Sequence, residues 1–169
     1  VRDNFHVEPD QWQHKALESA SDPKQQRIAL QACVGPGKTA VLAWLGWWFV
    51  TCFSDGTNHP QGACLAVDGA NLKANLWKEL AHWRDQSQLL QDLFEMTAEA
   101  IMQREFSKTW KLEARTWSKS ASQDEQGRSL SGLHAKSILY LIDEAGDINP
   151  AVLRAAEQGL SNCAWVRSY

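Results

Sequence analysis

The sequence predicts an α/β fold, in which a mostly parallel sheet lies between layers of helices. A β-like run at residues 27–32 leads through a glycine-containing loop into a long apolar helix pattern. A second apolar run, residues 137–142, is typical of a strand buried on both faces of a parallel sheet. The chain has 169 residues, of which 44% are hydrophobic and 22% charged, so it can form one domain with a substantial core.

The remaining elements follow from periodicity and from turn residues. Asp10 would cap the first helix, and Asn149 with Pro150 would begin the last one. Residues 118–131 are rich in Ser, Gln, Asp and Gly, which is typical of a loop. The chain stops inside its last predicted strand, so we interpret residues 1–169 as a single domain that is truncated. We expect helices over residues 14–20, 40–53, 72–86 and 149–158, and further strands over residues 63–67, 109–117 and 164–168.

The loop between the first apolar run and its helix has the composition of a phosphate-binding loop. Residues 32–39 read Ala-Cys-Val-Gly-Pro-Gly-Lys-Thr. Gly35 and Gly37 allow the backbone to curl so that several N–H groups point at one anion. The start of the following helix adds partial positive charge at the same place. A strand, a glycine-rich loop, Gly-Lys-Thr and a helix form the order that such a loop needs.

Two side chains of this loop carry the expected chemistry. Lys38 would reach the β- and γ-phosphates of a nucleotide, and Thr39 would offer its hydroxyl to Mg²⁺. The loop departs from the strict pattern at Ala32, where a glycine is expected, and Pro36 has no N–H to offer. A simple glycine turn between strand and helix is the alternative interpretation.

Two acids, Asp143 and Glu144, directly follow the strand predicted over residues 137–142. Open α/β sheets bind ligands at the carboxyl ends of their strands. Asp143 would hold Mg²⁺ through its water shell, and Glu144 would polarise an attacking water as a general base. The alternative is a pair of acids that end a strand at the surface. The phosphate loop favours the catalytic interpretation, because the loop supplies a phosphate-binding site and the two acids supply a metal ligand and a general base.

A glutamine ahead of the phosphate-loop strand can read adenine, because its side-chain amide both donates and accepts hydrogen bonds. Gln13 is the candidate for this role and Gln11 the reserve. A solvated helix residue is the alternative, and the sequence leaves it open.

Composition limits the classes of partner. The net charge of −3 means that a nucleic-acid contact must come from a local patch or from partner subunits.

The cysteines lack metal-ligand spacing, so we interpret them as free intracellular thiols. No signal peptide is visible, and the most apolar stretch, residues 40–53, is too short to span a bilayer. Trp44, Trp47 and Trp48 in that stretch fall at helical spacing and are interpreted as core residues.

Taken together, these residues resemble the ATPase domain of the large terminase subunit of tailed bacteriophages, the motor that drives DNA into procapsids. The resemblance extends over almost the whole chain and implies a P-loop NTPase fold of the RecA/ASCE-like type, a three-layer sandwich. Two segments, Leu-Trp-Lys-Glu-Leu at 76–80 and Gly-Leu-His at 132–134, are more particular to terminases than the phosphate loop or the Asp-Glu pair. The landmarks are Pro-Asp-Gln-Trp-Gln at 9–13, Gly-Pro-Gly-Lys-Thr-Ala at 35–40, Asn-Leu-Trp-Lys-Glu-Leu at 75–80 with Trp83, Ser-Gly-Leu-His-Ala at 131–135 and Leu-Ile-Asp-Glu-Ala at 141–145.

The resemblance implies a set of roles in binding and hydrolysing ATP. Glu144 would be the catalytic base, and Thr39 with Asp143 would serve Mg²⁺. Arg128 is the nearest candidate for the arginine that stabilises transition-state charge, acting on a neighbour's ATP, with Arg27 and Arg154 in reserve. The expected nucleotide-binding residues are Gly35, Pro36, Gly37, Lys38, Thr39, Ala40 and, on the adenine side, Gln13.

The resemblance also implies partners and a location. These are double-stranded DNA, the small terminase subunit, the portal protein, a homo-oligomeric ring during packaging, and the cytoplasm of the bacterial host. The family's coupling segment and its C-terminal nuclease domain have no counterpart in this chain, so we expect no nuclease activity from it. Two alternatives stay open: a helicase-like nucleic-acid-dependent ATPase, which would need a second RecA-like domain, and an inactive nucleotide-binding or assembly module.

Overall fold

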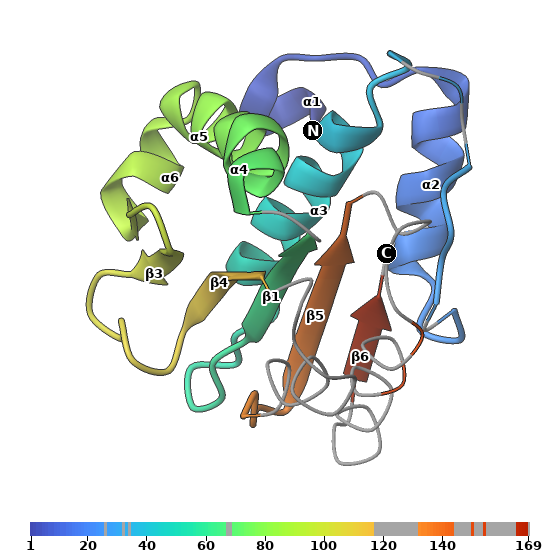
Figure 1. Cartoon of the computed structure of the whole chain (residues 1–169). Helices are drawn as coiled ribbons and strands as arrows, with labels where there is room; N and C mark the ends of the chain where they lie inside the picture. Colours follow the sequence, from blue (N-terminus) through green and yellow to red (C-terminus); the bar gives the residue numbers. More distant parts are fainter. Residues whose placement is uncertain are drawn as a thin grey trace.

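The structure is a computed structural model of the whole chain (Figure 1). The residues that it describes are 1–25, 27–31, 33, 35–66, 69–116, 132–143, 150 and 154, together with the backbone of 165–168.

The described strands form one mixed sheet in the order β2-β3-β4-β1-β5-β6. β4, β1, β5 and β6 run parallel to one another, whereas β3 is antiparallel to both β2 and β4. This arrangement confirms the predicted α/β fold with a mostly parallel sheet. The strands are β1 (Gln61–Ala66), β2 (Phe94–Met96), β3 (Ala100–Gln103), β4 (Lys111–Thr116), β5 (Ser137–Ile142) and β6 (Trp165–Ser168).

The described helices gather around α3, which crosses behind the sheet (Figure 1). A π-helical turn, Lys73–Trp77, joins α4 to α5, so the helix predicted over residues 72–86 is one nearly continuous segment with a local π distortion. The helix predicted over 149–158 lies outside the described residues except for Pro150 and Arg154, which are helical. The helices are α1 (Arg2–Phe5), α2 (Gln11–Ser21), α3 (Lys38–Cys52), α4 (Gly69–Leu72), α5 (Lys78–Asp85) and α6 (Gln88–Leu93).

α3 is buried on all of its sides, because apolar residues occupy nearly every position between Val41 and Val50. Trp44 and Trp47 are buried and Trp48 is half-buried, which confirms their interpretation as core residues. One face of the helix packs on the sheet: a β-carbon at Gly46 would lie 3.1 Å from a methyl group of Leu141.

The direction of α3 follows from its contacts with β4. Trp110, which immediately precedes β4, donates its indole N–H to the carbonyl of Val50, near the end of α3, at 2.8 Å. The end of the helix therefore lies over the start of this strand, and its first residue, Lys38, points toward the carboxyl edge of the parallel strands. Figure 1 shows the same relation, since α3 begins at the end of the molecule toward which the arrowheads of β1 and β5 point.

The strand predicted over residues 27–32 is wrong for the residues described. Arg27 forms an isolated bridge, and residues 28–31 have no regular secondary structure. Ile28 and Leu30 pack against the core while alternate residues face solvent. The alternation that suggested a strand reflects this one-sided packing, which does not require a ladder of hydrogen bonds.

Candidate functional site

The predicted phosphate loop has the backbone conformation that its glycines suggested. Gly35 and Gly37 adopt φ angles of 85° and 88°, in the left-handed region that L side chains rarely enter. A β-carbon at Gly35 would meet no atom within 4 Å, so the loop leaves open space on that side. Gly37 is the N-cap of α3, whose first turn has N–H groups that no carbonyl of the helix can accept. The turn can therefore receive an anion.

Lys38 directs its ammonium back onto its own loop. The Nζ donates a hydrogen bond to the backbone carbonyl of Cys33 at 2.7 Å. The side chain is half-buried and starts at the first position of α3. The cation that was predicted to meet phosphates therefore lies against the backbone of its own loop, at Cys33.

The backbone at Asp143 is fixed by the sheet. Its N–H donates to the carbonyl of Leu65 at 3.2 Å, which extends the pairing of β1 and β5 by one residue beyond Ile142. The side chain is half-buried. Burial, with the negative charge of Asp143 as a further cause, raises the pKa of the Cys64 thiol, so this thiol stays protonated and belongs to the core. The carboxylate thus lies close to the carboxyl end of β1.

The start of α3 and Asp143 therefore share one edge of the sheet. This is the edge where the predicted phosphate loop and the predicted metal-binding acid should meet. The predicted base Glu144 and the predicted arginine Arg128 lie outside the described residues, so their roles stay predictions. The reserve arginines Arg27 and Arg154 are both exposed.

A metal held at this edge would depend on few protein ligands. Pro36, Thr39 and Ala40, in the turn and the first residues of α3, are half-buried. Among the described residues there is no group of three or more His, Cys, Asp or Glu side chains that could hold a metal ion. Mg²⁺ bound through a hydroxyl, one carboxylate and nucleotide phosphates needs no such group. The predicted pair of Thr39 and Asp143 fits this kind of site.

Gln13 lies beside the phosphate loop. Its side chain is only 7% exposed, so the alternative of a solvated helix residue is wrong, whereas Gln11 is exposed. The Oε1 accepts a hydrogen bond from the backbone N–H of Asp10 at 2.8 Å. The Nε2 lies 2.7 Å from the position that a β-carbon of Gly37 would take. The contact with adenine stays a prediction.

The contact between α2 and the loop was not predicted from the sequence, although a sequence pattern exists for one end of the Gln13 amide. Asp-x-x-Gln at the start of a helix is the pattern of a capping box, in which the third helical residue bonds back to the N-cap backbone. This pattern could have placed the Oε1 of Gln13. Nothing in the sequence indicates that the other end of its amide touches Gly37.

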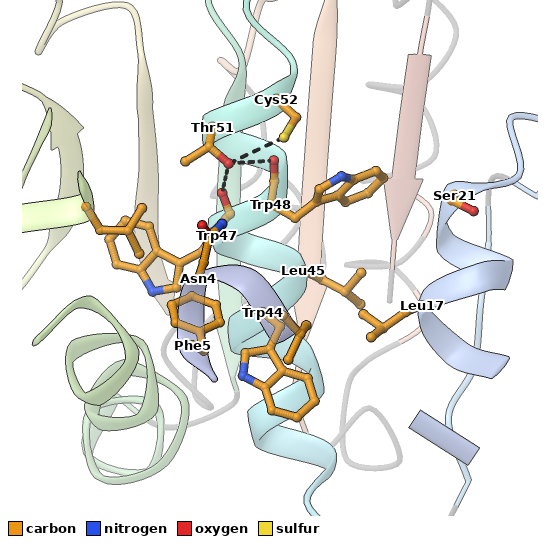
Figure 2. A pocket seen from close by; sticks show the side chains of 12 residues that line it. Asn4, Phe5, Leu17, Ser21, Trp44, Leu45, Trp47, Trp48, Thr51 and Cys52 are labelled. Atoms are coloured by element: carbon orange, nitrogen blue, oxygen red, sulfur yellow. Dashed lines mark hydrogen bonds between the residues drawn. The ribbon is translucent and has the colours of Figure 1, made fainter. Parts of the chain in front are cut away.

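A separate cavity of about 250 Å³ flanks α3. Figure 2 shows Phe5 of α1 on one side of the helix and Leu17 of α2 on the other, with the indoles of Trp44 and Trp48 between. Among the described residues that line this cavity there is no Asp, Glu, Lys, Arg or His. In the part of the chain that the structure describes, no helix has the length and apolarity to cross a membrane.

Comparisons with known proteins were made by sequence and by structure. No protein-family model and no curated protein matches the sequence. Three large terminases are among the solved structures that match with high probability. The HK97 bacteriophage large terminase has a TM-score of 0.64 at 13% identity, over 96% of this chain. The large terminase of a thermophilic bacteriophage in complex with ADP has a TM-score of 0.60 at 14% identity, over 95%. A mutant ATPase domain of the Thermus phage P74-26 large terminase has a TM-score of 0.64 at 15% identity, over 99%.

The fold is that of a large-terminase ATPase domain. This confirms the fold that the sequence resemblance implied. The chain spans 33%, 38% and 66% of the three matched chains, so it corresponds to part of each of them. The predicted site residues that the structure describes are Gln13, Gly35, Pro36, Gly37, Lys38, Thr39, Ala40 and Asp143.

Proposed function

We propose that this chain is an ATP-hydrolysing motor domain of a phage large terminase, which powers translocation of double-stranded DNA into procapsids. One observation carries the proposal: within a terminase ATPase fold, the start of α3 lies at the same sheet edge as Asp143. The complex of one similar terminase with ADP supports a nucleotide as the ligand.

The residues at this edge fit ATP and Mg²⁺. The open turn at Gly35 and the first N–H groups of α3 offer a place for phosphate oxygens. Lys38 neutralises the β- and γ-phosphates once it leaves the carbonyl of Cys33. Thr39 and Asp143 hold Mg²⁺, which when bound neutralises charge that develops on the phosphates. Glu144 accepts the proton of the attacking water.

The partners in this proposal come from the terminase resemblance. They are double-stranded DNA, the small terminase subunit, the portal protein and further copies of the chain in a ring, with Arg128 acting on the ATP of a neighbouring copy. With a net charge of −3, a DNA contact would need a local basic patch or other subunits. The cytoplasm of the bacterial host is the chain's site of action.

A pair of variants tests the proposal. Lys38→Ala removes the cation from the loop, so binding of MgATP should be lost. Glu144→Gln keeps the size of the side chain but removes the base, so MgATP should bind with wild-type affinity while turnover falls by about 10²-fold or more. Binding is measured by calorimetry and turnover by phosphate release, each with and without double-stranded DNA and partner subunits.

The matched control is Glu99→Gln, an exposed acid between β2 and β3, which should leave binding and turnover unchanged. Hydrolysis by Glu144→Gln at the wild-type rate would show that the base is assigned wrongly. A wild-type chain that binds no MgATP, alone or with its partners, would overturn the proposal as a whole. Stimulation by single-stranded but not double-stranded DNA would favour the helicase-like alternative.

A further inference from the structure

Gln13 is held in place by the helix to which it belongs. It is the third residue of α2, and its Oε1 accepts the N–H of Asp10, the N-cap of that helix, at 2.8 Å. The side chain is 7% exposed. Swinging the amide away would break this hydrogen bond and leave a backbone donor of the helix start without its partner. The amide group is therefore fixed in position and in orientation.

The other end of the same amide lies against the turn of the phosphate loop. The Nε2 is 2.7 Å from the place that a β-carbon of Gly37 would occupy. Gly37 has a φ of 88° and is the N-cap of α3, and its carbonyl accepts the N–H of Val41 at 3.2 Å as the helix begins. The conformation of this one residue sets the direction of the first N–H groups of α3.

We infer that Gln13 is a positioning residue for triphosphate binding, acting through Gly37 on the phosphate loop. This inference rests on the proposed function. The amide is hydrogen-bonded to the cap of α2 and packs against the turn at Gly37, and this contact restricts how the turn can move relative to α2. A residue in this role supports binding of the triphosphate whatever base it carries. A residue that reads adenine would instead use both ends of its amide on the base edge.

Base-independent binding is the readout that separates these two roles. We would measure the affinity of the wild-type chain, Gln13→Ala and Gln25→Ala for MgATP, MgGTP and magnesium tripolyphosphate by calorimetry. We expect Gln13→Ala to weaken all three by the same factor of about ten, a size typical of coupling between contacting residues. Gln25→Ala replaces an exposed glutamine that follows α2, and this variant should bind all three as the wild type does. A loss confined to MgATP, or no loss, would overturn the inference.

A second measurement needs no nucleotide and so stands if the proposed function fails. The thermal midpoint is measured for Gln13→Ala, Gly37→Ala and the double variant. An alanine at position 37 is strained by its φ in any background, but it clashes with the Nε2 only when Gln13 is present. We expect Gly37→Ala to lower the midpoint clearly less in the Gln13→Ala background. Equal losses in both backgrounds would show that the two residues are not coupled and would overturn the inference.

Discussion

The ammonium of Lys38 and the backbone carbonyl of Cys33 form a 2.7 Å hydrogen bond that closes the phosphate loop on itself. The loop thus supplies its own acceptor for the cation that we assign to the phosphates. A triphosphate that binds Lys38 must replace this carbonyl as the acceptor. The exchange is favourable, because a hydrogen bond from the ammonium to an anionic phosphate oxygen is stronger than one to a neutral carbonyl.

Removal of this contact should loosen the loop before any ligand binds. In Lys38→Ala we expect the amides of Gly35 and Gly37 to exchange with solvent about fivefold faster, for a loss of about 1 kcal/mol of local stabilisation. Hydrogen exchange followed by NMR measures this directly. Lys24→Ala, an exposed lysine in the turn after α2, should leave both amides unchanged. Unchanged exchange in Lys38→Ala would mean that the hydrogen bond does not order the loop.

Two tryptophans of α3 differ in one hydrogen bond, and their replacement should differ in cost. The indole N–H of Trp47 donates to the carbonyl of Leu80 in α5 at 3.0 Å, whereas that of Trp44 has no hydrogen-bond partner among the described residues. Both side chains are buried. We expect Trp47→Phe to lower the free energy of unfolding by about 1–3 kcal/mol more than Trp44→Phe, because only the former loses a satisfied buried donor. Urea unfolding followed by circular dichroism checks the order, and a larger loss for Trp44→Phe would contradict it.

The centre of the sheet leaves no room for a side chain at Gly62. A β-carbon there would lie 2.7 Å from a methyl group of Leu112 and 2.9 Å from the carbonyl oxygen of Leu139. Gly62→Ala should therefore lower the free energy of unfolding by about 1–3 kcal/mol through overpacking against backbone. Gly69→Ala, at the start of α4, is the matched control, since its nearest neighbour would be an ordinary 3.6 Å contact. Equal stability of the two variants would show that β1 can shift to accommodate the methyl group.

Asp55, in the loop before β1, forms an ion pair with Lys136, in the segment before β5. The contribution of this ion pair to stability should depend on pH. A hydrogen bond from Lys136, and further ones from Asn58 and Thr57, hold the pKa of Asp55 well below its ordinary value. A carboxyl with a lowered folded-state pKa stabilises the fold above its unfolded pKa, about 4, and loses this contribution as the pH falls further. The thermal midpoints of the wild type and Asp55→Asn should thus differ near pH 7 and converge below about pH 4.

The same experiment has an internal control. Asp3→Asn replaces an exposed acid of α1 and should track the wild type across the whole range. Because Asp55 is at the surface, added salt should narrow the difference between the wild type and Asp55→Asn. A difference that persists unchanged at acidic pH would show that the carboxylate charge is not what holds the loop.

The sequence predicted the elements that are buried on more than one side. β5 occupies the same residues as predicted, and α3 and β1 lie within two residues of their predicted ends. Their apolar runs are long because both faces meet other layers, and long runs give a strong signal. The antiparallel edge formed by β2 and β3 was not predicted. These strands are short and only half-buried, so few inward residues mark them in the sequence.

The site was predictable only where it depends on local sequence. The turn at Gly35 and Gly37 follows from its glycines, and the position of Asp143 follows from the end of a buried strand. The bond between Lys38 and Cys33 depends on the path of the loop, and the contact between Gln13 and Gly37 depends on how α2 packs beside it. No pattern within either segment encodes such tertiary contacts.

The burial of α3 has a consequence for the loop that precedes it. Residues Val41–Val50 lie in the packed interior, with a cavity on one flank beside Trp44 and Trp48, so the helix cannot move along its axis without opening further voids in the core. The core therefore sets the direction of the helix start, and an anion that binds at Gly37 would meet backbone N–H groups that are already oriented.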